Sequence, residues 1–276
     1  MKKLILIATI IMLAAACGPR QQAEQEAEHL PEPAVLQAGK LLGIRVYTIE
    51  FAPGVTPDEF SDFIKEKFNP AYEKHHPGVN LFPLLGRTGE CVDCWSTLYL
   101  FESVEVRDKY FTADGSRIEV SKEVSEKMQP LLEELFQMAE WTSTHTDWEI
   151  MGDTGIPGPE LQAGNLLGLH TINYELAPGV TLDEYLDFIK NEYVSALKKH
   201  FPGGNGFVLS SRTPECEDCY GLLFVFESVE VRDRYWRDDG SYTELGQASL
   251  EKMQPVFEEM SKLGEYTTTY TDWVIQ

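Results

Sequence analysis

The chain contains the same module twice, since residues 36–151 and 161–276 align without a gap at a constant offset of 125 positions. Of the 116 aligned positions, 61 carry the same residue in both copies, and Phe101–Asp108 recurs unchanged as Phe226–Asp233. Solenoid repeats are only about 20–50 residues long, so this period excludes a solenoid. Each copy is instead long enough to fold around its own core. The chain therefore carries two halves of an internal pseudo-homodimer.

Residues 1–16 are predicted to be a signal peptide rather than part of the fold. Lys2 and Lys3 precede an apolar run over residues 4–16, and these thirteen residues are too few for a helix that spans a bilayer core of about 30 Å. The run ends in LAAAC at Cys17, which resembles the bacterial lipobox, although Ala14 stands where leucine is most usual. The resemblance implies that Cys17 is lipidated. An ordinary signal peptide followed by a chance cysteine is the alternative.

Residues 17–35 are predicted to form a lipidated, flexible tether. Gln, Glu, Ala and Pro dominate this stretch and offer too little apolar surface to fold. Several acyl chains on Cys17 would anchor the protein firmly, because each buried methylene contributes about 0.8 kcal/mol. Gly18 after the cysteine agrees with sorting to the outer membrane of a Gram-negative bacterium. We therefore expect a lipid-anchored outer-membrane protein that faces the periplasm or the cell surface. Its expected partner is the lipid bilayer, which holds the acyl chains on Cys17.

The formal net charge of -22 argues against nucleic acid as a partner, because an acidic chain is repelled by phosphate backbones. Of the five cysteines, Cys17 is assigned to lipid, which leaves two Cys-x-x-Cys motifs. An even remainder in an exported chain favours the disulfides Cys91–Cys94 and Cys216–Cys219. A redox site is disfavoured because acidic neighbours would raise the thiol pKa values. A zinc site made by all four thiolates is a further alternative.

Each module is expected to contain a strand, a helix, two strands, a helix and a final strand. Leu41–Phe51 and Leu166–Leu176 are apolar, β-branched or aromatic runs that end in Ala-Pro-Gly, as strands do. A capping box then starts a helix at Thr56 and again at Thr181. The remaining elements of the first copy are expected around residues 81–87, 95–101, 104–111, 128–138 and 141–150. Residues 152–160 are expected to link the copies.

This element order is that of a ferredoxin-like unit. Occurring as a tandem pair of about 115 residues each, it resembles the dimeric α+β barrel superfamily, which includes antibiotic-biosynthesis monooxygenase-like and NIPSNAP-like proteins. The resemblance rests on element order over residues 36–276 and implies an α+β fold. Two ferredoxin-like β-α-β-β-α-β repeats would form one pseudo-dimeric barrel within one chain, and the protein is expected to be a monomer.

Strand alternation separates two faces of the first strand. We expect Leu42, Ile44 and Val46 to pack on the helices, so that Arg45 and Tyr47 face the barrel lumen. The lumen would then be an inter-repeat cavity that suits a small, partly apolar ligand. The residues expected to bind the ligand are Arg45, Tyr47, His145, His170, Tyr174 and Tyr270. Several of these positions carry different residues in the two copies. Such differences could build an asymmetric pocket, although drift at unconstrained surface positions would also explain them.

No catalytic residue is identified, because the chain lacks a nucleophile elbow, phosphate loop, HExxH motif or calcium loop. We therefore favour ligand binding without an assigned cofactor. One alternative is an enzyme of the barrel superfamily, a cofactor-free or haem-assisted monooxygenase with His170 or His145 as base or ligand. The other is a metal or redox protein that uses the Cys-x-x-Cys motifs.

Overall fold

A computed structural model describes residues 34–152, 158–213 and 219–276. The predicted signal peptide, Cys17 and nearly all of the predicted tether lie outside these ranges, as does Cys216. Ala34, the first described residue, is buried in the core. Val35 forms an isolated antiparallel bridge with Glu160.

Both copies fold into the expected ferredoxin-like order. Repeat 1 contains β1 (Leu41–Phe51), α1 (Pro57–Phe63), the π-helical turn η1 (Ile64–Phe68), α2 (Asn69–His75), β2 (Val79–Gly89), β3 (Trp95–Phe101), α3 (Val104–Asp108), α4 (Glu119–Lys127), α5 (Gln129–Met138) and β4 (Ala139–Met151). Repeat 2 contains β5 (Leu166–Leu176), α6 (Leu182–Phe188), the π-helical turn η2 (Ile189–Tyr193), α7 (Val194–His200), β6 (Gly204–Ser211), β7 (Tyr220–Phe226), α8 (Val229–Asp233), α9 (Glu244–Leu263) and β8 (Gly264–Ile275).

Local chemistry explains where the first helix of each repeat begins. The hydroxyl of Thr56 accepts a hydrogen bond from the Glu59 amide, and the Glu59 carboxylate accepts one from the Thr56 amide. Thr181 and Glu184 form the same reciprocal pair in repeat 2. Both capping boxes are therefore confirmed, and they satisfy amide groups that have no partner within the helix.

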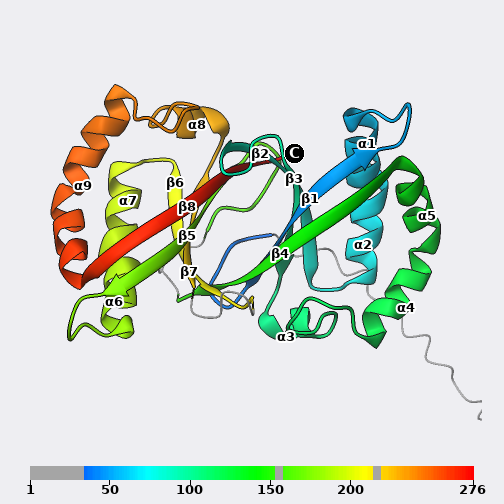
Figure 1. Ribbon diagram of the computed structural model, residues 1–276, viewed down its shortest axis with the longest axis horizontal. Helices are drawn as coiled ribbons and strands as arrows, with labels where there is room; N and C mark the ends of the chain where they lie inside the picture. The colour runs from blue at the N-terminus through cyan, green and yellow to red at the C-terminus, as the bar shows by residue number, and fades with distance from the viewer. Residues whose placement is uncertain (1–33, 153–157, 214–218) are drawn as a thin grey trace, which may run out of the picture. The chain divides into compact units, whose positions relative to one another are not determined.

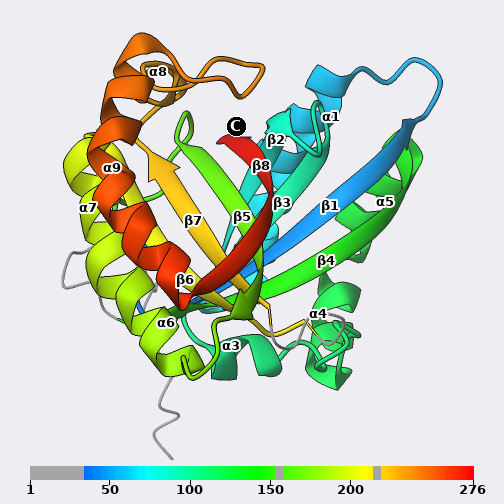
Figure 2. The same cartoon turned by 60° about the vertical axis from the view of Figure 1, so that its left-hand side comes forward.

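The strands close into one barrel in the order β1-β3-β2-β8-β5-β7-β6-β4. Each repeat contributes four neighbouring strands, and the two sets meet where β2 pairs with β8 and where β4 pairs with β6. The helices of each repeat cover the outer face of that repeat's own strands (Figures 1 and 2). The chain therefore has the expected α+β fold, with two ferredoxin-like repeats forming one pseudo-dimeric barrel. Within the described ranges, no helix combines the length and apolar composition needed to cross a membrane.

The barrel interior is a shared apolar core. One cluster of buried side chains includes residues from every strand of the closed barrel and from both repeats, among them Leu42, Ile44, Trp148, Leu167 and Trp273. The expectation that Leu42 and Ile44 pack on the helices was therefore wrong. An eight-stranded barrel is just wide enough for side chains to fill, so its inward face takes the apolar set and the mixed set turns outward beneath the helices.

Candidate functional site

The residues predicted to line a ligand cavity do not face the lumen. They lie between each sheet and the helices that cover it, where each repeat has a pocket of its own. Arg45, Tyr47 and His145 belong to repeat 1, whereas His170 and Tyr270 belong to repeat 2. The predicted ligand-binding residues are therefore divided between pockets of the two repeats and do not share one cavity between them.

Strand pairing explains how these residues meet. Arg45 of β1 lies directly opposite His145 of β4, and His170 of β5 lies opposite Tyr270 of β8. The two positions that differ between the copies are thus cross-strand neighbours, which interact directly across a sheet. Arg45 and His145 both line a small pocket of repeat 1, whereas His170 and Tyr270 both line the pocket of repeat 2.

The pocket of repeat 1 has a volume of about 110 Å³ and an aromatic wall. Trp95 and Trp141 come from strands, while Phe60 and Phe68 come from helical segments. Phe68 belongs to the π-helical turn η1, and such turns are frequent at functional sites. No Asp or Glu is among the described residues that line this pocket.

Arg45 places a guanidinium group in this wall. Burial works against its charge, yet the neighbouring phenols of Tyr99 and Tyr47 raise the pKa of Arg45 above its ordinary value. Within the described residues, no hydrogen bond or ion pair reaches the guanidinium. The hydroxyl oxygens of Tyr47 and Tyr99 lie 3.5 Å apart beside it. Arg45 is therefore a charged, partly buried group that forms no ion pair with a described carboxylate, although the charge of Asp147 also helps to raise its pKa.

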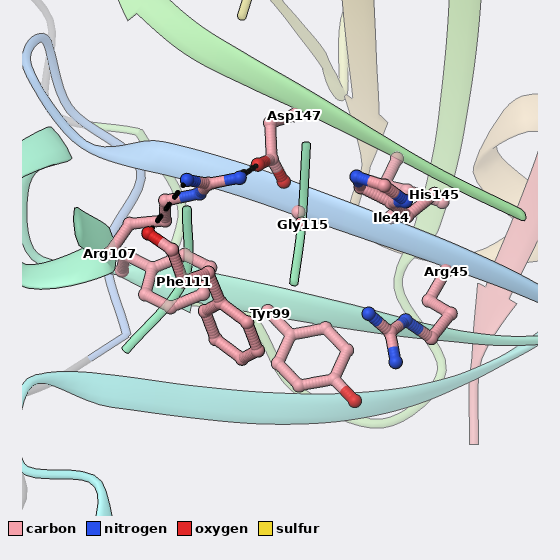
Figure 3. A pocket seen from close by; sticks show the side chains of 10 residues that line it. Ile44, Arg45, Tyr99, Arg107, Phe111, Gly115, His145 and Asp147 are labelled. Atoms are coloured by element: carbon pink, nitrogen blue, oxygen red, sulfur yellow. Dashed lines mark hydrogen bonds and ion pairs between the residues drawn. The ribbon is translucent and has the colours of Figure 1, made fainter. Parts of the chain in front are cut away.

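A second, smaller pocket of repeat 1, about 30 Å³ in volume, shares Arg45 and Tyr99 with the first and contains a buried ion pair. Arg107 donates from Nε to Asp147 Oδ2 at 2.8 Å, and its Nη2 lies 2.6 Å from the same oxygen. Figure 3 shows Arg107 joined to Asp147, whereas the Arg45 guanidinium is turned toward the Tyr99 ring. Gly43 makes room for this carboxylate, because a Cβ there would lie 3.0 Å from Asp147 Oδ1. The charges of this pair compensate each other.

The pocket of repeat 2 is larger, at about 280 Å³. Its lining is mostly aromatic and includes Phe201, Phe224, Phe226, Trp236, Tyr242 and Tyr266. Tyr193, from the π-helical turn η2, also contributes. Burial raises the pKa of Tyr193 well above its ordinary value, so its phenol stays neutral. Phenol hydroxyls give such a wall hydrogen-bonding groups without charge.

His170 is the imidazole of this second pocket. Its ring stacks on Tyr270, with centroids 5.2 Å apart, and meets the edge of Phe224 at 4.9 Å. Burial lowers the pKa of His170 to about 4, and the opposing influence of Asp272 is smaller. The imidazole is therefore neutral at pH 7. No hydrogen bond joins it to an orienting side chain among the described residues, so the arrangement of a base and its orienter is missing.

The end of the second pocket is fixed by both repeats. Arg232 donates from Nη2 to Asp272 Oδ2 at 2.6 Å, and the Thr88 hydroxyl of repeat 1 donates to the same oxygen at 2.6 Å. Thr213 of repeat 2 makes the reciprocal contact with repeat 1, because its hydroxyl accepts a hydrogen bond from the Asp147 amide at 2.8 Å. Each pocket is thus anchored to the neighbouring repeat through one threonine.

None of the described cysteines is among the residues that line either pocket. Cys91 and Cys94 form the predicted disulfide, with their Cα atoms 5.5 Å apart. Cys219 is disulfide-bonded as well, whereas Cys216 lies outside the described residues. Cys91, Cys94 and Cys219 pack against the barrel core. A disulfide has no thiolate to give a metal, which argues against the four-thiolate zinc alternative.

Sequence reasoning identified some of the pocket residues and missed others. Tyr174 was expected in the cavity but stacks on Tyr185, with ring centroids 5.5 Å apart. Arg107 and Arg232, to which sequence reasoning gave no role in a pocket, are buried ion-pair partners. Their identity in both copies was a signal available in the sequence. The missed lining residues, for which helical spacing alone gave no functional signal, include Phe68, Asn69, Arg117, Tyr193 and Trp236.

No family model and no curated protein sequence matches this chain. Among solved structures, a chlorite dismutase variant from Candidatus Nitrospira defluvii is similar at 10% identity, covering 86% of this chain and 92% of its own, with a TM-score of 0.46. A haem-binding protein from Thermus thermophilus is similar at 10% identity, 90% and 95% coverage and a TM-score of 0.43. An anthrone oxidase-like protein shows 14% identity, 87% and 94% coverage and a TM-score of 0.42.

These similarities are too weak to carry an activity to this chain, because a fold does not determine chemistry. The strand pairings and pockets define the class of protein by themselves. It is a single-chain α+β barrel made of two ferredoxin-like repeats, each with an aromatic pocket between its sheet and its helices.

Proposed function

We propose that this protein is a membrane-anchored ligand-binding lipoprotein whose repeat 2 pocket takes a small, uncharged, partly apolar molecule. The observation that carries the proposal is the aromatic cavity of about 280 Å³ around neutral His170. This volume lies near the lower limit of small-molecule sites, roughly 300–1,000 Å³. The Arg232–Asp272 pair compensates its own charge, so the pocket offers no free charge to an ion.

Binding is favoured over catalysis because His170 has ring contacts instead of a hydrogen-bonded orienting group. His170 and the phenols of Tyr266 and Tyr270 can still position one polar group of a ligand. The ligand class that fits this lining is an aromatic molecule with one hydroxyl or carbonyl group.

Haem does not fit this lining. A four-ring macrocycle exceeds a cavity of about 280 Å³, and its propionates would need cations. Arg232 is the one cation among the described residues that line the pocket, and Asp272 already pairs with it. Addition of haem to the purified protein should leave the Soret band of free haem unchanged. A shifted band that disappears in His170→Ala would contradict this.

The binding proposal can be tested with 2-naphthol, measured by calorimetry and by tryptophan fluorescence. Thr268 lies at the exposed rim of the pocket, so Thr268→Trp should obstruct entry and weaken binding about ten-fold or more. Ser143 occupies the equivalent position in repeat 1, which makes Ser143→Trp the matched control. Equal loss in both variants, or no binding to the unmodified protein, would refute the proposal.

Lipid anchoring is supported by the lipobox-like LAAAC sequence at Cys17 and by the acidic, apolar-poor stretch that follows. In a Gram-negative host, Cys17→Ala should move the protein from the membrane fraction to a soluble fraction, whereas Gly18→Asp should leave it membrane-bound but redirect it to the inner membrane. Retention of Cys17→Ala in the outer membrane would exclude anchoring through Cys17.

We also infer that the protein is a monomer. The two repeats already supply the strand pairings that join the barrel halves, β2 with β8 and β4 with β6. The soluble fragment from residue 34 onward should have the mass of one chain in light scattering, and a dimer mass would contradict the inference.

A further inference from the structure

The pocket of repeat 1 contains a cation, Arg45, for which none of the described residues provides an ion-pair partner. The chain has 45 acidic and 23 basic residues, so carboxylates are abundant. Yet no described carboxylate forms an ion pair with Arg45, and none of the described lining residues is acidic. Removing a guanidinium from water without a partner is unfavourable, so an arginine held this way is suited to a ligand anion.

Asn69 gives a second, independent sign of a ligand in the same pocket. It is the first residue after the π-helical turn η1, and only 7% of its surface is exposed. Its Oδ1 atom has no hydrogen-bond partner among the residues that the structure describes. Buried polar atoms without partners are rare in folded proteins, which indicates that a polar group of a bound molecule completes this one.

The remaining wall fixes the size and shape of the ligand. Aromatic rings, among them those of Trp95, Trp141 and Phe60, surround a volume of about 110 Å³. A cavity of roughly 150 Å³ is known to take up benzene, so the pocket matches one ring and not several. Arg117 lies exposed among the lining residues, where a second positive charge favours the approach of an anion.

Repeat 2 provides an internal comparison. The five most polar lining positions of the repeat 1 pocket all become uncharged or apolar there: Arg45, Asn69, Ser96, Thr97 and Arg117 correspond to His170, Val194, Gly221, Leu222 and Tyr242. Most of the aromatic lining positions remain aromatic, as at Tyr99 and Phe224, although Tyr47 and Tyr72 become Ile172 and Leu197. The two copies therefore differ in charge preference while keeping the same kind of wall.

We propose that the repeat 1 pocket binds small aromatic monocarboxylates, with Arg45 holding the carboxylate and Asn69 a second polar group. This goes beyond the function proposed for repeat 2 and would make the protein a two-site binder, one site for an anion and one for a neutral molecule. An Arg guanidinium donates two parallel hydrogen bonds to a carboxylate, which gives direction as well as attraction.

The test uses benzoate as the probe and benzamide as its uncharged counterpart, both titrated calorimetrically into the protein from residue 34 onward. Benzoate should bind at least ten-fold more tightly than benzamide. Arg45→Gln should weaken benzoate binding at least ten-fold and abolish the preference, and Asn69→Val should weaken both ligands. Arg234 is an exposed arginine of repeat 2, so Arg234→Gln, with the same change in net charge, should bind as the unmodified protein does.

Arg45→Lys separates loss of charge from loss of folding, because it keeps the cation and should retain a preference for benzoate. Near-ultraviolet circular dichroism confirms that each variant is folded. The proposal fails if the unmodified protein binds benzoate and benzamide equally or binds neither. It also fails if folded Arg45→Gln keeps the preference. Binding of 2-naphthol in repeat 2 is measured with different variants, so the two proposals stand or fall separately.

Discussion

Replacing Asp272 by Asn should destabilise the whole barrel, because it removes the charge that compensates buried Arg232. The side chains of Arg232 and Asp272 are 3% and 7% exposed, and their ion-pair atoms lie 2.6 Å apart. The asparagine would keep the approximate shape and could still accept from the Thr88 hydroxyl, which now lies 2.6 Å from Asp272 Oδ2. The substitution therefore removes charge with little change in packing.

The expected cost is about 3 kcal/mol, at the low end of the 3–5 kcal/mol typical when one partner of a buried pair is removed. The low end applies because the Arg232 guanidinium keeps other acceptors. Its Nη1 donates to the carbonyls of Trp236 and Arg237 at 3.3 and 3.0 Å, and Asp233 lies 3.5 Å away. At roughly 2–4 °C per kcal/mol for a protein of this size, the melting temperature should fall by about 6–12 °C.

Urea unfolding followed by circular dichroism measures this loss in the soluble fragment. Asp238→Asn is the matched control, because Asp238 also pairs with an arginine, Arg87, but its side chain is 82% exposed. The control should cost less than about 1 kcal/mol, as surface ion pairs do. A second variant, Asp272→Asn with Arg232→Met, should recover part of the loss because no buried charge remains. If Asp272→Asn costs no more than Asp238→Asn, the reasoning about the buried charge is refuted.

Three further outcomes are expected. Burial lowers the pKa of both His76 and His170 from 6.5 to about 4, so the unfolded chain binds more protons than the folded chain between these pH values. The free energy of unfolding should therefore fall as the pH drops from about 6.5 to about 4. Over this window the urea midpoint of His76→Phe should fall less than that of the unmodified protein. Reduction of the four-residue Cys91–Cys94 loop should cost roughly 2 kcal/mol, measured by unfolding with and without reductant, and an unchanged midpoint would contradict this. Gly115→Ala should destabilise repeat 1 by about 1–2 kcal/mol, because Gly115 has φ +76 and a Cβ there would lie 2.3 Å from His145 Nε2. Thermal melting measures this loss. An unchanged melting temperature would contradict the expected clash with His145.

The local elements were predictable because short-range patterns determine them. Both capping boxes begin their helices where expected, and β1 and β5 have the predicted bounds Leu41–Phe51 and Leu166–Leu176. The order of these elements then predicted the ferredoxin-like repeat. One detail differed: the second helix of repeat 1 is divided into α4 and α5 at Met128, whereas α9 continues through Pro255.

The direction in which the strand faces point was not predictable from alternation. Alternation separates Leu42 and Ile44 from Arg45 and Tyr47, but a period of two fits either assignment of inside and outside. The choice depends on whether the lumen is wet or dry. The barrel closes with side chains from both repeats in contact, so the apolar set is inside and the polar set lies beneath the helices.

The sequence by itself determined that the chain is built from two equivalent modules, that each module is a ferredoxin-like unit, and that Arg45 and His170 are positions where the units differ. Only the tertiary structure decided that Arg45 and His170 lie in two different pockets, one in each repeat, and not together in one asymmetric cavity. The physical reason is that each of these residues lines a pocket of its own repeat, while the apolar core shared by the two repeats is built from the opposite face of the strands.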